Sequence, residues 1–206
     1  MSAKYSQAFG VGILILNLLS SAALADSATT PAAPVTPLDP KAILAEADKA
    51  LEIDRLDEAM KLYLQAAELN YTPAQVKLGE LADYSQFYEA AVGWYIMAAM
   101  QGDAAAQYHL ARMYLNGFGI EQDDAKASYW YRRSAAKDYV PSVKVLADSY
   151  RLGLMGVKVD LDQARAWDAK AKRLEAIEQA AIVKKLEALA EARKKLQEEA
   201  AKKTTD

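Results

Sequence analysis

The chain of 206 residues has no cysteine and only one histidine, His109. The lack of cysteine excludes a disulfide framework and lipid attachment through a cysteine. A single histidine without any thiol also excludes a His–Cys or His–His metal site within one chain. No serine lies in a nucleophile motif, so a Ser–His–Asp triad is not indicated. We therefore expect no metal, no cofactor and no enzymatic activity.

An excess of positive charge is also missing. The chain has 25 basic and 28 acidic residues, which gives a formal net charge of −3. A phosphate-backbone partner would need a basic face, so nucleic acid is not an expected partner. Apolar residues make up 52% of the chain and charged residues 26%, which is the composition of a globular protein.

Residues 1–25 have the pattern of a secretory signal peptide, with Lys4, an apolar run from Gly10 to Leu16, and Ala23-Leu24-Ala25 as a cleavage site. The alternative is an uncleaved membrane anchor. Asn17, Ser20 and Ser21 end the apolar run, however, and a spanning helix needs about 20 apolar residues. We expect export to a bacterial periplasm, with an extracellular or anchored location as the less favoured alternative. The mature chain is expected to have no membrane-spanning segment.

Residues 26–40 contain four of the six prolines, at positions 31, 34, 37 and 40. Proline fixes φ and has no amide hydrogen to donate, so this segment is predicted to be an extended linker. Its simplest role is that of a spacer.

From Lys41 onward, apolar residues recur every three or four positions, and no alternating run is long enough for a strand. This pattern predicts an all-α chain. The expected helices lie at 41–53, 56–69, 73–83, 86–100, 104–115, 123–137 and 141–152, with a long one from about 161. Leu62, Trp94 and Trp130 are 32 and 36 residues apart, and Trp167 follows after 37. Such a period indicates stacked helix-turn-helix repeats.

The turns between helices repeat as well. Asn70, Gly102 and Asp138 each follow a repeated tyrosine by seven residues, and each accepts the left-handed conformation of a helix C-cap. Gly117 and Gly119 form a second type of turn, in which glycine allows a positive φ and close packing.

An acidic cluster, Glu121, Asp123 and Asp124, follows this second turn. Asp123 stands where its carboxylate would cap the next helix. A calcium site is the alternative, but the ligand spacing of a calcium loop is absent. Capping is therefore the favoured interpretation.

These residues resemble the Sel1-like repeat, a relative of the tetratricopeptide repeat. The resemblance covers about residues 41–172 and is strongest in the third repeat. The matching positions there are Ala106, Leu110, Tyr114, Gly117, Gly119, Ile120, Asp123, Lys126, Ala127, Trp130, Tyr131 and Ala135. Ala111 and Ala147 depart from the pattern, since they replace a glycine that Gly79 retains, and Leu62 replaces a tryptophan.

The resemblance implies a right-handed α/α solenoid whose concave face is lined by the first helix of each repeat. It also implies that the protein acts as an adaptor or regulator of a larger assembly and does not catalyse a reaction. On this register most aromatic residues are predicted to be core. They are Trp94, Trp130, Trp167, Tyr63, Tyr95, Tyr114, Tyr131 and Tyr150. The tyrosines beside the register are freer to meet a ligand; they are Tyr84, Tyr88, Tyr108, Tyr129 and Tyr139.

Two lines of variable positions on the first helices are the candidate partner contacts. The first line is Val76, Tyr108 and Lys144, and the second is Glu80, Arg112 and Asp148. The alternative is a solvated face without a partner. His109 occupies the position of Lys77 and Val145, and we expect it to face solvent.

The C-terminal segment, residues 173–206, is predicted to continue the last helix. A narrow apolar stripe of Ile182, Leu186, Leu189 and Leu196 runs among its Lys, Arg and Glu residues, and these four are candidate interaction residues. The stripe is too short to predict a coiled coil. Three arrangements of this segment are compatible with the sequence. It could cap the solenoid, project towards a partner helix, or fray.

Together these features predict an exported, periplasmic helical-repeat adaptor that binds a protein or peptide of the cell envelope. The alternative is a glycan- or peptidoglycan-associated accessory of polysaccharide export or wall remodelling, with tyrosines as stacking surfaces.

Overall fold

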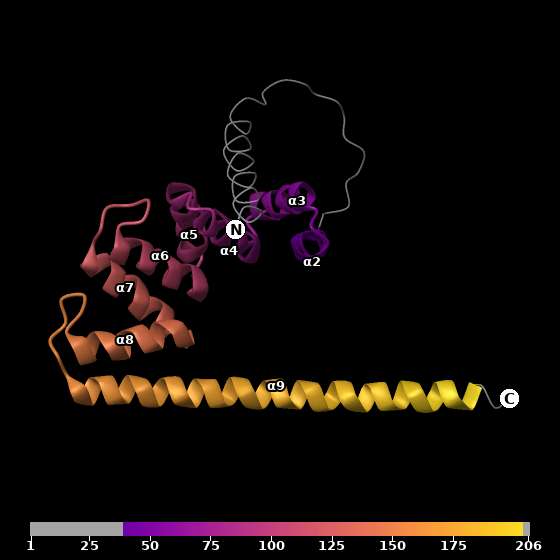
Figure 1. The fold of residues 1–206 in the computed structure, drawn as a ribbon. Coiled ribbons are helices and arrows are strands. Elements are labelled where there is room, and N and C mark those ends of the chain that lie inside the picture. Colours follow the sequence, from indigo (N-terminus) through magenta and orange to yellow (C-terminus); the bar gives the residue numbers. More distant parts are fainter. Residues whose placement is uncertain (1–38, 204–206) are drawn as a thin grey trace, which may run out of the picture. The chain divides into compact units, whose positions relative to one another are not determined.

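The computed structural model of the chain describes residues 39–203. The predicted signal peptide, residues 1–25, lies outside the described residues, as does nearly all of the predicted linker. The described residues form eight α-helices and no strand, as the sequence predicts (Figure 1). The helices are α2 (Pro40–Glu52), α3 (Leu56–Glu68), α4 (Thr72–Tyr84), α5 (Tyr88–Met100), α6 (Ala104–Asn116), α7 (Asp124–Ala135), α8 (Val140–Leu152) and α9 (Leu161–Lys203). Each predicted helix is found with its ends within two residues of the expected position.

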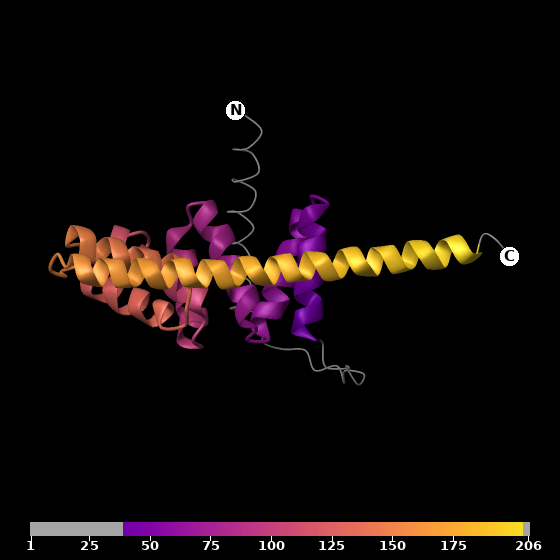
Figure 2. The same ribbon diagram turned by 90° about the horizontal axis from the view of Figure 1, so that it is seen from below.

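The chain divides into two compact bodies, an N-terminal body that ends at Tyr139 and a C-terminal body that begins at Val140. In the N-terminal body the helices pack as consecutive pairs, α2 with α3, α4 with α5 and α6 with α7. The pairs are joined by packing of α3 on α4 and of α5 on α6. In the C-terminal body α8 packs on the first part of α9, and Figure 2 shows α9 as one uninterrupted helix.

The repeated tyrosines form the centre of the N-terminal core. Tyr63 and Tyr95 are fully buried, and Tyr131 is 2% exposed. Trp94 and Trp130 are only half-buried and pack against the edge of the core. The prediction of a repeated aromatic core is therefore confirmed for these three tyrosines. The other aromatic residues predicted to be core are only half-buried; they are Tyr114, Tyr150, Trp94, Trp130 and Trp167.

Buried polar side chains join one repeat to the next. The amide of Gln75 donates to the carbonyl oxygen of Ala67, and that of Gln107 donates to the carbonyl oxygen of Ala99. Both the donors and the acceptors are 32 residues apart, so the same link occurs in two successive repeats. Each carbonyl lies near a helix C-terminus and also accepts a bond from a backbone N–H of the turn, that of Asn70 or Gly102.

The predicted caps are confirmed by the backbone. Asn70, Gly102 and Asp138 have φ values of 59°, 93° and 60°. Asp123 accepts a hydrogen bond from the backbone N–H of Lys126 at 2.9 Å, so its carboxylate caps α7 as expected. This bond lowers the pKa of Asp123.

Candidate binding face

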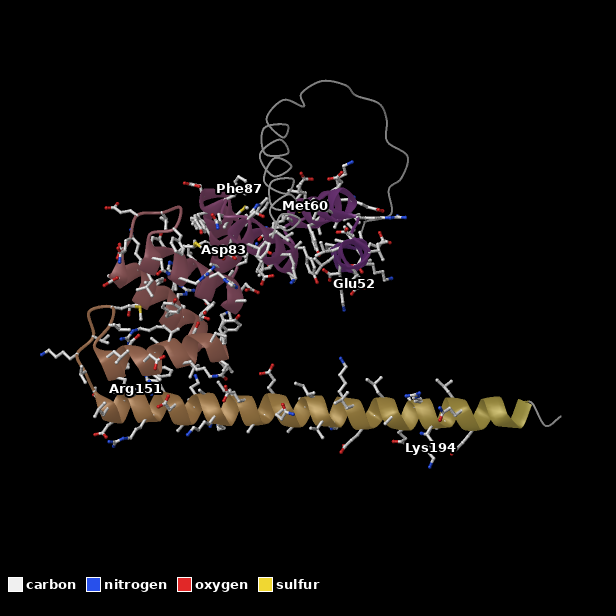
Figure 3. All side chains as sticks on the ribbon, in the orientation of Figure 1. Glu52, Met60, Asp83, Phe87, Arg151 and Lys194 are labelled. Carbon is white, nitrogen blue, oxygen red and sulfur yellow. The ribbon has the colours of Figure 1, made fainter. Side chains whose placement is uncertain are left out.

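An open pocket of about 380 Å³ lies in the N-terminal body, and we call it the first-helix pocket. Two predicted contact residues, Glu80 of α4 and Arg112 of α6, meet there. The complete lining is Glu80, Asp83, Tyr84, Gln86, Tyr88, Tyr95, His109, Arg112 and Phe118. Asp83 is labelled in Figure 3, at the C-terminal half of α4. The pocket thus combines charged and aromatic groups from three helices and two turns.

An ion pair joins the two first helices across this pocket. Nη2 of Arg112 donates to Oδ2 of Asp83. The Asp83 side chain is 15% exposed and that of Arg112 is 33% exposed, so the pair is partly sheltered from solvent. The Nε atom of Arg112 is buried and has no acceptor among the described residues. The guanidinium therefore keeps one donor that no described residue uses.

His109 is not a solvent-facing residue, which corrects the sequence-based expectation. Its side chain is 18% exposed, and its ring stacks on that of Tyr95 with centroids 4.8 Å apart. Burial, and then the nearby Arg112 charge, lower the pKa of His109, so the imidazole is neutral at pH 7. Its Nδ1 atom has no hydrogen-bond partner among the described residues.

Gly79 explains why His109 is largely covered here. A Cβ atom at residue 79 would lie 2.5 Å from Cε1 of Tyr95, so the tyrosine ring rests directly on the backbone of α4. The flat ring then offers a surface on which His109 stacks. Tyr95 is a core residue, as predicted, but it also lines the pocket. Burial and the Asp83 carboxylate raise the pKa of Tyr95.

One wall of the pocket is an aromatic pair. Tyr88, at the start of α5, stacks on Phe118 with centroids 4.8 Å apart. The pair forms because the α6–α7 turn lies against α5. A Cβ atom at Gly119 would come within 2.3 Å of the Tyr88 backbone. The predicted close packing of this glycine turn is therefore confirmed, and it fixes the place of Phe118.

Tyr108 is part of an aromatic cluster rather than a free contact. Its ring lies 5.3 to 5.7 Å from those of His109, Tyr131 and Tyr139. Burial raises the pKa of Tyr139, which we had expected to be freer for a ligand. Of the tyrosines beside the repeat register, Tyr84 is the most exposed, at 78%, and it lines the pocket.

The remaining candidates on the first helices are not among the residues that line the pocket. Val76 is 8% exposed and joins the core, because its apolar side chain packs with that cluster. Lys144 and Asp148 lie on α8 in the C-terminal body. Lys144 forms an ion pair with Glu175 of α9, and Asp148 pairs with Arg151. Each of these two charges is already paired within its own body.

The four tail candidates are exposed on α9. Ile182, Leu186, Leu189 and Leu196 are 46%, 60%, 56% and 66% exposed. Every described side chain from Ala176 to Glu198 is exposed, and Figure 3 shows them projecting from the helix around the labelled Lys194. None of the described helices is long and apolar enough to cross a membrane.

Sequence reasoning missed Asp83, His109 and Phe118 as pocket residues. A signal was present for Asp83, which lies three positions after Glu80 and hence on the same face of α4. His109 and Phe118 depend on how Gly79 and Gly119 bring neighbouring repeats together. Spacing within one repeat does not reveal such a contact.

Comparison with known proteins agrees with the repeat register. The Sel1 repeat matches residues 52–71, 72–103, 104–139 and 145–174. The chitin synthase regulator SKT5 of Saccharomyces cerevisiae is 30% identical over 120 residues, which are 55% of this chain and 17% of that protein. An exopolysaccharide production negative regulator of Rhizobium leguminosarum bv. viciae is 35% identical over 89 residues, which are 37% of this chain and 33% of that protein. The chain thus spans a third or less of these curated relatives.

A solved structure shares the fold. The Sel1 repeat protein from Oxalobacter formigenes is 32% identical, with a TM-score of 0.59 over 66% of this chain and 58% of that one. Its helical-repeat architecture is the one predicted from the sequence. The four repeat matches cover more than half of the residues, and the chain belongs to the Sel1 repeat family.

Proposed function

We propose that this chain is an exported adaptor of the cell envelope that binds a protein partner at the first-helix pocket. Sel1 repeats mediate protein–protein interactions. The observation that supports the pocket as the site is its unused polar groups. Nε of Arg112 and Nδ1 of His109 are buried without hydrogen-bond partners among the described residues. Buried polar groups are normally satisfied, so a ligand group that bonds to them gains affinity. Export is supported by the signal-peptide pattern of residues 1–25.

The charge of the N-terminal body favours a partner with basic residues. Its residues 39–139 contain 16 acidic and 10 basic side chains, a net charge of −6. Opposite charge on the partner would speed association and make binding weaker at high salt.

A variant of two pocket residues outside the core, the half-buried Glu80 and the exposed Tyr84, tests the proposal. Glu80→Lys with Tyr84→Ala reverses one charge and removes the exposed ring without disturbing the core. The test is a crosslinked capture from native envelope, read by mass spectrometry. We expect a specific protein captured by the native chain to be lost with the variant and kept by Tyr129→Ala. Tyr129 is the control because it is also exposed, at 51%, but lies on α7. Unchanged capture by the pocket variant would reject the pocket as the site.

A second candidate function is that of a glycan-associated accessory protein. Two of the relatives described above are named as regulators of chitin synthase and of exopolysaccharide production. The exposed ring of Tyr129 packs edge-on against Trp130 on α7, which supports a stacking surface for a sugar. Retention on a peptidoglycan or exopolysaccharide column that Tyr129→Ala abolishes would favour this candidate. No retention of the native chain would reject it.

A further inference from the structure

The outer face of α5 carries an exposed apolar stripe that its neighbours lack. Gly93 is exposed, and Ile96, Met97 and Met100 are 38%, 43% and 73% exposed. The spacing of three and four residues places them on one side of the helix. Glu89, also exposed, is the only charged residue of α5 and lies at the N-terminal end of the stripe.

The repeats themselves show that this stripe is unusual. The equivalent positions on α3, 32 residues earlier, are Lys61, Leu64, Gln65 and Glu68. The equivalent positions 36 residues later are Tyr129, Arg132 and Arg133 on α7 and Ala136 at its C-cap. Three of the four α3 positions are polar, and two of the α7 positions are arginine, whereas all four on α5 are apolar. The repeat fold therefore does not require apolar residues here.

Gly93 gives a second, independent observation. A Cβ atom at residue 93 would meet nothing within 4 Å. Glycine in the middle of a helix costs about 0.5–1 kcal/mol relative to alanine. At residue 79 glycine is needed because any side chain would clash with the Tyr95 ring. No described residue of this chain lies close enough to Gly93 to require a glycine there. An absent side chain at an exposed position permits close approach of another helix.

A second exposed apolar stripe among the described residues, on α9, has the same spacing as the stripe on α5. On α5, Glu89, Gly93, Ile96 and Met100 are separated by four, three and four residues. On α9, Ile182, Leu186, Leu189 and Arg193 are separated by four, three and four residues. Both sets span 11 residues, or about 16 Å of helix. An antiparallel arrangement would place Leu189 on Gly93 and Arg193 beside Glu89.

We propose that α9 of a second copy packs antiparallel on α5, with Leu189 in the space left by Gly93. The first part of α9 is held on α8 by the Arg151–Asp168 and Lys144–Glu175 ion pairs. No glycine or proline occurs from Leu161 to Lys203, so α9 has no point at which to fold back. Residues 140–206 have a net charge of +3 and residues 39–139 a net charge of −6. These opposite charges favour contact between the C-terminal body of one copy and the N-terminal body of another. Reciprocal exchange would give a closed two-fold dimer.

The absence of cysteine allows a direct test by disulfide crosslinking. Gly93→Cys protein and Leu189→Cys protein are prepared separately, mixed and oxidised. We expect a covalent dimer that forms in the mixture more than in either protein alone. Lys61→Cys, at the equivalent position of α3, is the matched control and should not crosslink to Leu189→Cys. Dimers formed by Leu189→Cys alone at the same rate would show α9–α9 pairing and overturn the proposal.

Charge reversal provides the second measurement. Glu89→Arg places two like charges together and should raise the dimer dissociation constant about tenfold, as measured by light scattering or sedimentation. Glu89→Arg combined with Arg193→Glu should restore the native value. A native chain that is monomeric at all accessible concentrations, or a double variant as weak as the single one, would overturn the proposal. Because α5 and α9 are tested without any envelope partner, this outcome is independent of the proposed adaptor function.

Discussion

The ring of Tyr95 occupies the space that any side chain at residue 79 would need. The distance from a Cβ atom there to Cε1 of Tyr95 would be 2.5 Å. Tyr95 is fully buried and also carries the stacked ring of His109. A single glycine therefore links the packing of one repeat to the shape of the pocket.

The first prediction compares two helical glycines. Gly79→Ala should lower the free energy of unfolding by about 1–3 kcal/mol, because overpacking moves a buried ring. At concentrations where the protein is monomeric, Gly93→Ala should raise it by about 0.5–1 kcal/mol, since alanine is the better helix former and has room within the chain. Urea denaturation followed by circular dichroism measures both. Equal effects of the two substitutions would contradict the packing argument.

The second prediction concerns the glycine turn. Gly119 has a φ of +64°, and a Cβ atom there would lie 2.3 Å from the Tyr88 backbone. Gly119→Ala should therefore destabilise the protein by about 3 kcal/mol, through left-handed strain and a clash with backbone.

Gly156→Ala is the matched control for this turn. Its φ is +73°, but a Cβ atom there would meet nothing within 4 Å. Only the strain remains, at about 1 kcal/mol. A loss as large as that of Gly119→Ala would show that contact with Tyr88 is unimportant.

The helices were predictable from the sequence because their signals are local. Apolar periodicity, the caps at Asn70 and Asp138, and the Asp123 carboxylate each act within a few residues of the helix they define. The repeat period then extends one well-marked repeat to its neighbours. For these reasons the helix ends agree within two residues.

The pocket was only partly predictable, because it depends on contacts between repeats. The position of His109 is occupied by Lys77 in the preceding repeat, which is exposed, and this suggested a surface residue. The same position is largely covered in α6 because the Tyr95 ring lies over Gly79 and the imidazole stacks on it. Val76 shows the opposite error. It was predicted to contact a partner because its position varies between repeats, but its side chain is buried in the core.

The third prediction follows from the environment of His109. Burial lowers its pKa from 6.5, so the unfolded chain binds a proton more readily than the folded one. This contribution to stability is complete above pH 6.5 and is lost as the pH falls from there through the lowered pKa. The free energy of unfolding of the native chain should therefore decrease from pH 7 to pH 5.

His109→Phe isolates this effect, since the chain has no other histidine and phenylalanine preserves the stack on Tyr95. The decrease in unfolding free energy between pH 7 and pH 5 should be smaller in the variant than in the native chain. The imidazole proton resonances of the native chain should titrate below pH 6.5. A titration midpoint above pH 6.5 would contradict the buried position.

The fourth prediction concerns the end of α9. Every described side chain from Ala176 to Glu198 is exposed, so this segment adds no buried contact within the C-terminal body. A chain that stops after Glu178 keeps the Lys144–Glu175 ion pair and the packing of α8 on α9. At concentrations where both proteins are monomeric, its unfolding free energy should match that of the full chain within about 0.5 kcal/mol. Helical ellipticity per molecule should fall. A large loss of stability at equal dilution would mean that residues beyond Glu178 pack on the chain's own body, and the unpartnered stripe would then have its partner in the same molecule.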